Sequence, residues 1–304
     1  MKRLLSIAFL NFMLFMLSCD AQEKNDVTII KKSANSLIDK NSKIEVLGDS
    51  FIATEGPLWD SDNNQLIFSD VRQNKIFVWN ENNGINEYIF PSGSTGYAPF
   101  ASEVIKGSNG LAFDTNKNIV LCQVNDRRLS YVKNIKSDYP KFYTLIDNYE
   151  GKRFNSPNDL SIGNSGDIYF TDPPYGFFVN GKNLEIKYRE IKFNGVYKLS
   201  SNGKISLITS SMSLPNGIAV SKDEKYLYVN NAGSEDPKIM KFNLKSLKGK
   251  LFFEVSPKFY RPAEVHKLCG DCSLAEKEMG WIRKTDFPGL VKKMYENDYR
   301  LLSQ

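Results

Sequence analysis

The sequence predicts an all-β fold of the β-propeller type, incomplete, and followed by a short α-helical tail. One pattern of turns and short strands recurs four times, with a period near 50 residues. The predicted strands are short apolar runs bounded by turn residues, as at Leu66 and Phe68. Repeats of this length that consist of short strands are typical of propeller blades.

The first 21 residues have the pattern of an export signal. Lys2 and Arg3 precede an apolar run over residues 4–17, which is too short to span a bilayer comfortably. The following "MLSC" resembles a relaxed lipobox in which Cys19 would be lipidated after cleavage, and ordinary cleavage after Ala21 is the alternative. Either process places the mature protein outside the cytoplasm, in the periplasm or as a lipoprotein attached to the outer membrane or cell surface.

Residues 22–43 are polar and lack hydrophobic periodicity, which predicts a tether. Residues 44–254 contain the repeats, which include "TEGPLWD", "SNGLAFD", "SPNDLSI" and "LPNGIAV". Their anchor residues are 54, 49 and 58 positions apart, and they are Glu55, Asn109, Asn158 and Asn216. At this spacing the segment has room for about four to five blades.

The anchor residues are candidate ligands of a cation. In a propeller the innermost strands surround a central channel, so residues at equivalent positions of successive blades converge at its mouth. Asn-Gly and Asn-Asp pairs are also common turn sequences, and for a single motif the turn is the simpler interpretation. Four motifs in register, with Glu55 in the same place, favour ligands. One carboxylate with several amide carbonyls suits Ca²⁺, and another divalent cation is the alternative.

The composition excludes several functions. His266 is the only histidine, so a zinc site with several imidazoles is excluded and histidine-based nucleophilic catalysis would depend on this one residue. The net charge of +5 is spread along the chain, and no basic cluster alternates with aromatic residues. We therefore expect no nucleic-acid partner. A monomer that binds a small molecule is the expectation.

Several motifs resemble the family of senescence marker protein, gluconolactonase and luciferin-regenerating enzyme. They are "EGPLWD" from Glu55, "NSPND" from residue 155 and "YFTDPPYG" from residue 169, and the resemblance covers about residues 44–254. It implies a six-bladed propeller, a divalent cation in the channel, and hydrolysis of a lactone or related ester. By position, Glu55 and Asn158 match metal ligands. Asn109 matches a site residue that contacts metal or substrate, and Arg153 is expected to contact substrate.

One position departs from the family pattern. The resemblance implies an aspartate that binds metal and handles a proton where this chain has Asn231. Asparagine can offer its carbonyl oxygen to an ion, but it cannot act as a general base. Asn231 is therefore expected to be a metal ligand in the catalytic site. The proton acceptor stays open among three carboxylates, which are Asp159, Asp172 and Asp236.

The tail, residues 255–304, has a different character. "SLAE" from residue 273 fits a helix capping box, and two helices are expected. From about residue 257 the stretches "FYRPAEV", "GDCSLAEKEMGW" and "LVKKMYENDYRLL" resemble the C-terminal end of GDP-mannose 4,6-dehydratase. The nucleotide-binding motif of that family is absent. The chain therefore looks like a chimera whose tail contributes nothing to catalysis.

These observations predict an exported, calcium-dependent hydrolase of sugar lactones or related esters. Its partner would be a small lactone or another sugar-derived molecule. Two alternatives stay open: an exported protein that binds metal and sugar without turnover, and an inactive chimeric gene product.

Overall fold

The computed structural model describes residues 35–39, 41–99, 102, 104–133, 140–179, 183–184, 188–254, 292 and 296. The chain divides into two compact units, Met1–Glu254 and Val255–Gln304. Every strand that the structure describes belongs to the first unit. The predicted export signal, most of the predicted linker, and the predicted helical tail except Lys292 and Glu296 lie outside the described residues. Within the described residues, no helix has both the length and the apolar character needed to cross a membrane.

The first two sheets are antiparallel meanders of four strands each. Blade 1 consists of β1 (Thr54–Asp60), β2 (Gln65–Asp70), β3 (Lys75–Asn80) and β4 (Gly84–Ile89). Blade 2 consists of β5 (Ser108–Phe113), β6 (Ile119–Gln123), β7 (Arg128–Lys133) and β8 (Lys141–Ile146). A two-stranded hairpin, β9 (Asn148–Tyr149) and β10 (Lys152–Arg153), follows.

The third and fourth sheets repeat the same order. Blade 3 consists of β11 (Leu160–Ile162), β12 (Ile168–Asp172), β15 (Gly195–Leu199) and β16 (Ile205–Thr209). Between β12 and β15 lie a 3-10 turn, η2 (Tyr175–Phe177), and the hairpin of β13 (Phe178–Val179) and β14 (Asn183–Leu184). Blade 4 consists of β17 (Pro215–Val220), β18 (Tyr226–Asn231), β19 (Lys238–Asn243) and β20 (Gly249–Glu254).

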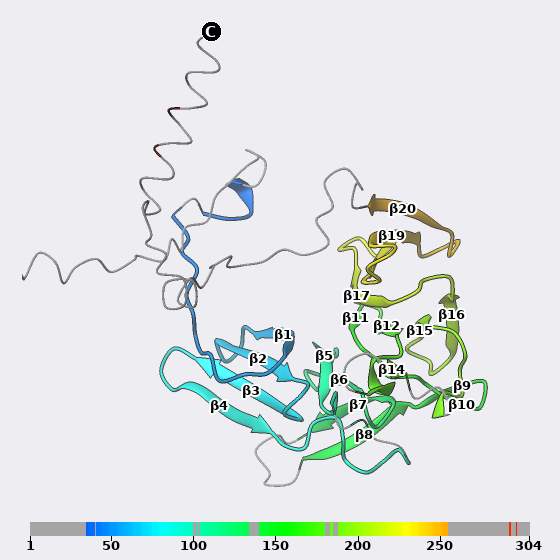
Figure 1. The fold of residues 1–304 in the computed structure, drawn as a ribbon, viewed down its shortest axis with the longest axis horizontal. Coiled ribbons are helices and arrows are strands. Elements are labelled where there is room, and N and C mark those ends of the chain that lie inside the picture. Colours follow the sequence, from blue (N-terminus) through cyan, green and yellow to red (C-terminus); the bar gives the residue numbers. More distant parts are fainter. Residues whose placement is uncertain are drawn as a thin grey trace, which may run out of the picture. The chain divides into compact units, whose positions relative to one another are not determined.

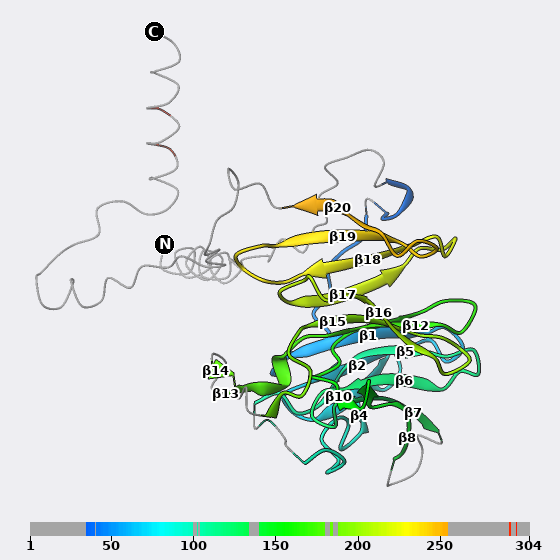
Figure 2. The same ribbon diagram turned by 90° about the vertical axis from the view of Figure 1, so that its right-hand side faces the viewer.

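The four sheets follow one another round an arc that stays open between the fourth and the first sheet (Figure 1). The first strands of successive blades are neighbours: β1 contacts β5, β5 contacts β11, and β11 contacts β17. Figure 2 shows blade 4 from the side, with β17 innermost and β20 outermost. The propeller prediction is confirmed, with four blades in the described residues. The six blades that the resemblance implies are not present among these residues.

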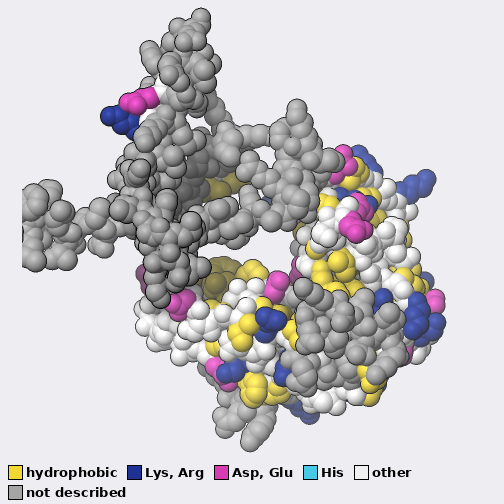
Figure 3. Space-filling view, in the orientation of Figure 1, with side chains coloured by type: hydrophobic (Ala, Val, Ile, Leu, Met, Phe, Trp, Pro, Cys, Tyr) yellow, Lys and Arg dark blue, Asp and Glu magenta, His cyan; other side chains and the backbone are white. Residues whose placement is uncertain are grey.

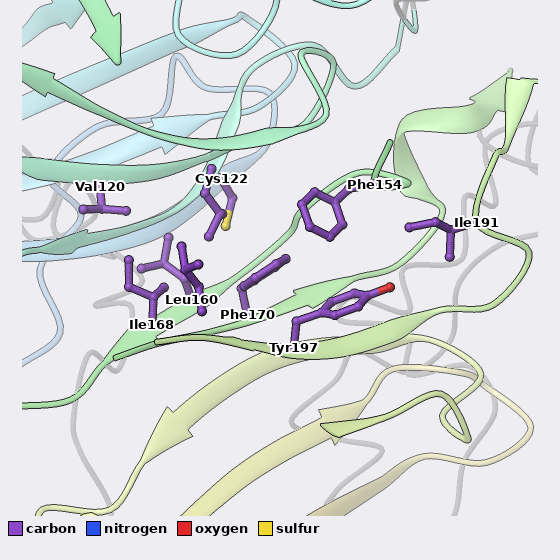
Figure 4. Close-up of a cluster of buried hydrophobic side chains, with 10 residues drawn as sticks. Val120, Cys122, Phe154, Leu160, Ile168, Phe170, Ile191 and Tyr197 are labelled. Carbon is purple, nitrogen blue, oxygen red and sulfur yellow. The ribbon is translucent and has the colours of Figure 1, made fainter. Parts of the chain in front are cut away.

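Three apolar clusters lie between adjacent blades, because alternate residues of each second strand point to opposite neighbours. In β6, Leu121 packs with Ile67 of blade 1, whereas Val120 and Cys122 pack with Phe170 of blade 3. Figure 4 shows this second cluster, in which side chains of both blades point toward one another. The sheets of blades 2 and 3 are therefore covered on both faces by the neighbouring blades.

Tyr197, on β15, gives a stability prediction. Its ring is fully buried against Phe154 and Phe170, and its hydroxyl has no hydrogen-bond partner among the described residues. An unpaired buried hydroxyl costs about 1–3 kcal/mol. We expect Tyr197→Phe to raise the free energy of unfolding by about 1 kcal/mol in urea titration. Tyr143→Phe, on the half-buried β8, is the control and should be neutral; a destabilised Tyr197→Phe would show that the hydroxyl is satisfied.

Candidate metal centre

The structure places the four anchor residues at the heads of adjoining inner strands. Glu55, Asn109 and Asn216 are the second residues of β1, β5 and β17, and Asn158 lies two residues before β11. Contacts link each head to the next. The amide of Gly110 donates to the carbonyl of Asn158 at 2.8 Å, and the Asp159 carboxylate accepts from the amide of Ile218 at 3.1 Å.

Glycine at position 56 permits the close approach of β1 to β5. Its φ of +54° is in the left-handed region, which side chains other than glycine disfavour. A Cβ built on Gly56 would lie 2.1 Å from the backbone oxygen of Asn109, well inside van der Waals contact. The "EGP" sequence therefore allows β1 to approach β5 closely enough to bring Glu55 toward the other heads.

Two carboxylates of this centre interact electrostatically. Burial raises the pKa of Glu55, and the negative charge of Asp159 raises it further. Burial also raises the pKa of Asp159, against the hydrogen bonds that it accepts from the amides of Ile218 and Leu160. A cation between two such groups would reverse both effects, because it favours their charged forms.

Amide groups complete the centre. Asn109 and Asn158 are nearly buried, and within the described part of the chain their side chains make no hydrogen bond to protein. The side-chain amide nitrogen of Asn216 donates to the Tyr175 hydroxyl at 3.2 Å, so the side-chain oxygen of Asn216 is not used in that bond. Tyr175 comes from η2, within the "DPPYG" segment. Within the described residues no three or more His, Cys, Asp and Glu side chains form a cluster that could hold a metal ion. The candidate donors at the strand heads are therefore carboxylate and amide oxygens.

Asn231 and Asp172 share a different position. Each is the last residue of the second strand of its blade, as are Asp70 and Gln123. Asp172 accepts from the amides of Asn155 and Ser156 at 2.8 and 2.7 Å, and Asn231 accepts from the amide of Leu214 at 2.7 Å. These side chains therefore fix the chain segment that enters each blade.

The structure does not show Asn231 among the anchor residues. Its amide nitrogen donates to Ser213 and to the backbone oxygen of Asp236, so both ends of its side chain are engaged in blade 4. The side chain of Asp236 is about half exposed and forms an ion pair with Lys238 at 2.6 Å. The ligand role of Asn231 and the proton-acceptor roles of Asp172 and Asp236 stay predictions, whereas the geometry assigns structural contacts to all three.

Arg153, predicted to contact substrate, lies on β10. Its backbone amide donates to Glu190, and its guanidinium lies 5.6 Å from the centroid of the Tyr97 ring. One terminal nitrogen, Nη1, is buried without a hydrogen-bond partner among the described residues. An unpaired guanidinium nitrogen is a ready donor to a ligand oxygen. Sequence reasoning left Asp159 as one of three candidates and missed Tyr175, which has no repeat partner to mark it.

The buried carboxyl of Asp172 gives a pH prediction. Burial raises its pKa to about 7, from 3.8. The folded state therefore holds this proton more tightly than the unfolded state, so its contribution to stability is present below pH 4 and is lost as the pH rises to about 7. We expect the unfolding free energy of the wild type, relative to Asp172→Asn, to fall over this interval, as measured by urea titration at several pH values.

Asp70→Asn is the matched control, at the same position of blade 1. Burial acts to raise the pKa of Asp70, but hydrogen bonds from Ile52 and Gln73 outweigh it and lower the pKa. Its contribution is present above pH 4 and is lost as the pH falls through the folded pKa, so the trend has the opposite sign. Parallel trends in the two variants would contradict the assignment.

The four blades, with carboxylate and amide side chains at the adjoining heads of their inner strands, define a propeller protein. The protein-family model described as the SMP-30/gluconolactonase/LRE-like region matches residues 53–257, which is more than half of the chain. The chain therefore belongs to this family.

Two relatives illustrate the match. A gluconolactonase from Zymomonas mobilis is 36% identical over 220 residues, which are 72% of this chain and 60% of that protein. The structure of a gluconolactonase from Xanthomonas campestris matches with a TM-score of 0.57 at 26% identity, covering 69% of this chain and 65% of the other. This chain thus spans less than two thirds of both relatives.

A separate short match concerns the dehydratases. GDP-mannose 4,6 dehydratase 2 from Caenorhabditis elegans is 43% identical over 58 residues, which are 19% of this chain and 15% of that protein. Partial matches of this length do not establish the predicted fusion.

Proposed function

We propose that this chain is a calcium-dependent hydrolase of sugar lactones or related esters. The observation that carries the proposal is that adjoining inner strands bring Glu55 within electrostatic reach of Asp159, near Asn109 and Asn158, whose side chains make no hydrogen bond within the described residues. Family membership supports the reaction class, since both relatives described above are gluconolactonases.

The donor chemistry fits a hard cation. All of the candidate donors are oxygens, and calcium takes carboxylate and amide oxygens in flexible geometry. Glu55, Asn158 and Asn216 are the residues that would hold the ion, with Asn109 facing substrate. When bound, a divalent cation would polarise the carbonyl of a lactone.

The remaining chemistry belongs to the chain's own residues. Asp159 is the one of the three open carboxylates that lies at the centre, and we assign its carboxylate oxygens to accept the proton of the attacking water. Its raised pKa brings it closer to neutral pH, where general bases work best. The hydrogen bonds from Ile218 and Leu160 hold it in place. The test is a pH–rate profile of Asp159→Asn, in which the acid limb should disappear.

The proposal predicts the effect of neutralising Glu55. We expect Glu55→Gln to weaken calcium binding about 10- to 100-fold, because it removes the charged donor from the residues that would hold the ion. Isothermal titration calorimetry measures the affinity, and a panel of sugar lactones measures turnover with and without a chelator. Glu81→Gln, in an exposed turn, is the control. Unchanged calcium affinity in Glu55→Gln would rule out this centre.

A non-catalytic role is the alternative, because Asn231 stands where the family resemblance implies a proton-handling aspartate, and asparagine cannot act as a general base. Calcium-dependent thermal protection without turnover of any lactone would support a protein that binds metal and sugar. Neither protection nor turnover would support an inactive product.

Export and the chimeric tail belong to the same proposal. Periplasmic or surface location follows from residues 1–21, and mass spectrometry of the mature N-terminus separates lipidation of Cys19 from plain cleavage. A six-bladed ancestor joined to a helical, dehydratase-like tail follows from the two resemblances. Sequencing across the junction near residue 255 in the source genome tests it.

A further inference from the structure

Tyr175 is the least buried residue of η2, the 3-10 turn between β12 and the hairpin of β13 and β14. The other two residues of this turn, Gly176 and Phe177, are buried. The Tyr175 side chain is half-buried, and its hydroxyl contacts the side chain of Asn216 at the head of β17. A turn that lies outside the repeats therefore brings a phenol to the heads of the inner strands.

Contacts with neighbouring segments hold this turn in place. The hydroxyl of Ser156 donates to the carbonyl of Pro173 at 2.5 Å and accepts from the amide of Gly176 at 2.9 Å. A Cβ built on Gly176 would lie 2.8 Å from the Cβ of Ser156, so the two segments are in close contact. The Phe177 ring is fully buried, and the Arg127 guanidinium lies 5.1 Å from its centroid. The backbone that carries Tyr175 is therefore fixed, as a preorganised hydrogen-bond donor requires.

The Tyr175 hydroxyl has a proton that no described residue accepts. A phenol oxygen can accept and donate at the same time, and at neutral pH it carries its proton. Here it accepts from the side-chain nitrogen of Asn216 at 3.2 Å, and among the described residues it donates to no group. Burial raises the pKa of Tyr175, and the negative charge of Glu55 also raises it, so the phenol is within electrostatic reach of that carboxylate.

Asp159, the base that we assigned above, lies against the same stretch of chain, residues 216–218. Its Oδ2 accepts from the amide of Ile218 at 3.1 Å, and a Cβ built on Gly217 would lie 3.8 Å from that oxygen. Inside the arc of blades, hydrophobic and acidic side chains border the opening (Figure 3). A proton acceptor and a hydrogen-bond donor thus share one short segment, and the addition of water to a carbonyl uses both kinds of group.

We propose that Tyr175 is a further catalytic residue, whose hydroxyl donates a hydrogen bond to the carbonyl oxygen of the bound lactone. This inference rests on the proposed hydrolase function. When the water oxygen bonds to the carbonyl carbon, the π electrons move to the carbonyl oxygen, and the hydrogen bond from Tyr175 stabilises the negative charge. The displaced proton of the water goes to Asp159.

The second half of the reaction uses the same two groups. The electron pair on the former carbonyl oxygen re-forms the double bond, the bond from carbon to the ring oxygen breaks, and that oxygen takes the proton back from Asp159. The product is the open hydroxy acid. Tyr175 keeps its own proton throughout. A carbonyl oxygen has two lone pairs, so the bond from Tyr175 leaves one for a cation.

The kinetic test is Tyr175→Phe, which removes the hydroxyl and keeps the ring. We expect kcat for the lactones that the wild type hydrolyses to fall about 100-fold, as for the loss of an oxyanion donor, with KM changed less than about threefold. The acid limb of the pH–rate profile, assigned to Asp159, should be retained. Tyr131→Phe is the matched control and should keep full kcat, because that ring stacks on Tyr143 in the outer strands of blade 2.

Ligand binding tests the donor without turnover. The probes are a cyclic phosphonate, which mimics the tetrahedral intermediate, and the matched cyclic ether, which has no oxygen in place of the carbonyl oxygen. Calorimetry should show that Tyr175→Phe weakens the phosphonate about 100-fold and the ether less than about threefold. Equal losses for the two probes would show that the hydroxyl does not reach this oxygen, and would overturn the inference.

Three other results would overturn it, and they separate it from the proposed function. Full kcat in Tyr175→Phe, beside a wild type that hydrolyses lactones, rejects the role of Tyr175 alone. A loss of calcium affinity as large as that of Glu55→Gln would assign Tyr175 to positioning Asn216 instead. A wild type that hydrolyses no lactone rejects the proposed function, and the inference fails with it. Circular dichroism and thermal unfolding confirm that the variants are folded.

Discussion

Replacement of Phe170 by alanine is expected to lower the free energy of unfolding by about 3–5 kcal/mol. Phe170 has no exposed surface, and its ring lies 5.2 Å from that of Phe154 and 5.3 Å from that of Tyr197, centroid to centroid. Removing the ring leaves a cavity between blades 2 and 3, where the surrounding strands are fixed by their own ladders and cannot collapse into it. Urea titration followed by circular dichroism measures the change.

Phe90→Ala is the matched control for that substitution. Phe90 is 52% exposed, and Lys75 lies 5.6 Å from its ring centroid. Its loss should cost well under half as much as the loss of Phe170, because little apolar surface returns to water. Equal effects of the two variants would mean that the cluster between blades 2 and 3 is not a principal source of stability.

Gly56→Ala is expected to destabilise the protein by about 2–5 kcal/mol and to abolish calcium binding. The new methyl group would have to adopt a left-handed backbone conformation and would lie 2.1 Å from the Asn109 carbonyl oxygen. Because a backbone atom cannot move aside as a flexible side chain can, β1 must withdraw from β5, and Glu55 moves with it. Thermal unfolding and calcium titration measure the two effects.

Gly84→Ala separates the two causes. Gly84 also has a positive φ, of +62°, but nothing lies within 4 Å of a Cβ at that position. It therefore reports the conformational cost alone, about 1–2 kcal/mol, without the clash. If Gly56→Ala costs no more than Gly84→Ala and retains calcium, the close approach of the first two inner strands is not required by the centre.

The blades could be predicted because their signals are local. Short apolar runs such as residues 66–68 indicate a strand within a few positions, and the turn sequences recur about every 50 residues. The same repeat register predicts that Glu55, Asn109 and Asn158 lie at the heads of successive blades. Local pattern and global arrangement agree there, which is why the prediction of a propeller is confirmed.

The choice among carboxylates could not be predicted in the same way. Asp159 and Asp172 both follow short polar motifs, but Asp159 precedes β11 at the channel mouth, whereas Asp172 ends β12 and closes the entry to blade 3. Their difference depends on strand pairing and on which neighbour each side chain meets. Asn231 illustrates the same limit, since its equivalence to Asp70, Gln123 and Asp172 appears only when the ends of the second strands are compared in space.

The stacking of the blades has a consequence for how the molecule opens. Blades 2 and 3 are each held by apolar clusters on both sides, whereas blades 1 and 4 are each held by one such cluster. The stability of such an array approximates a sum of nearest-neighbour couplings, so its units need not melt together. Backbone amides of β18 and β19 should therefore exchange with deuterium through fraying from the end, while those of β6 and β12 report the most cooperative part of the structure.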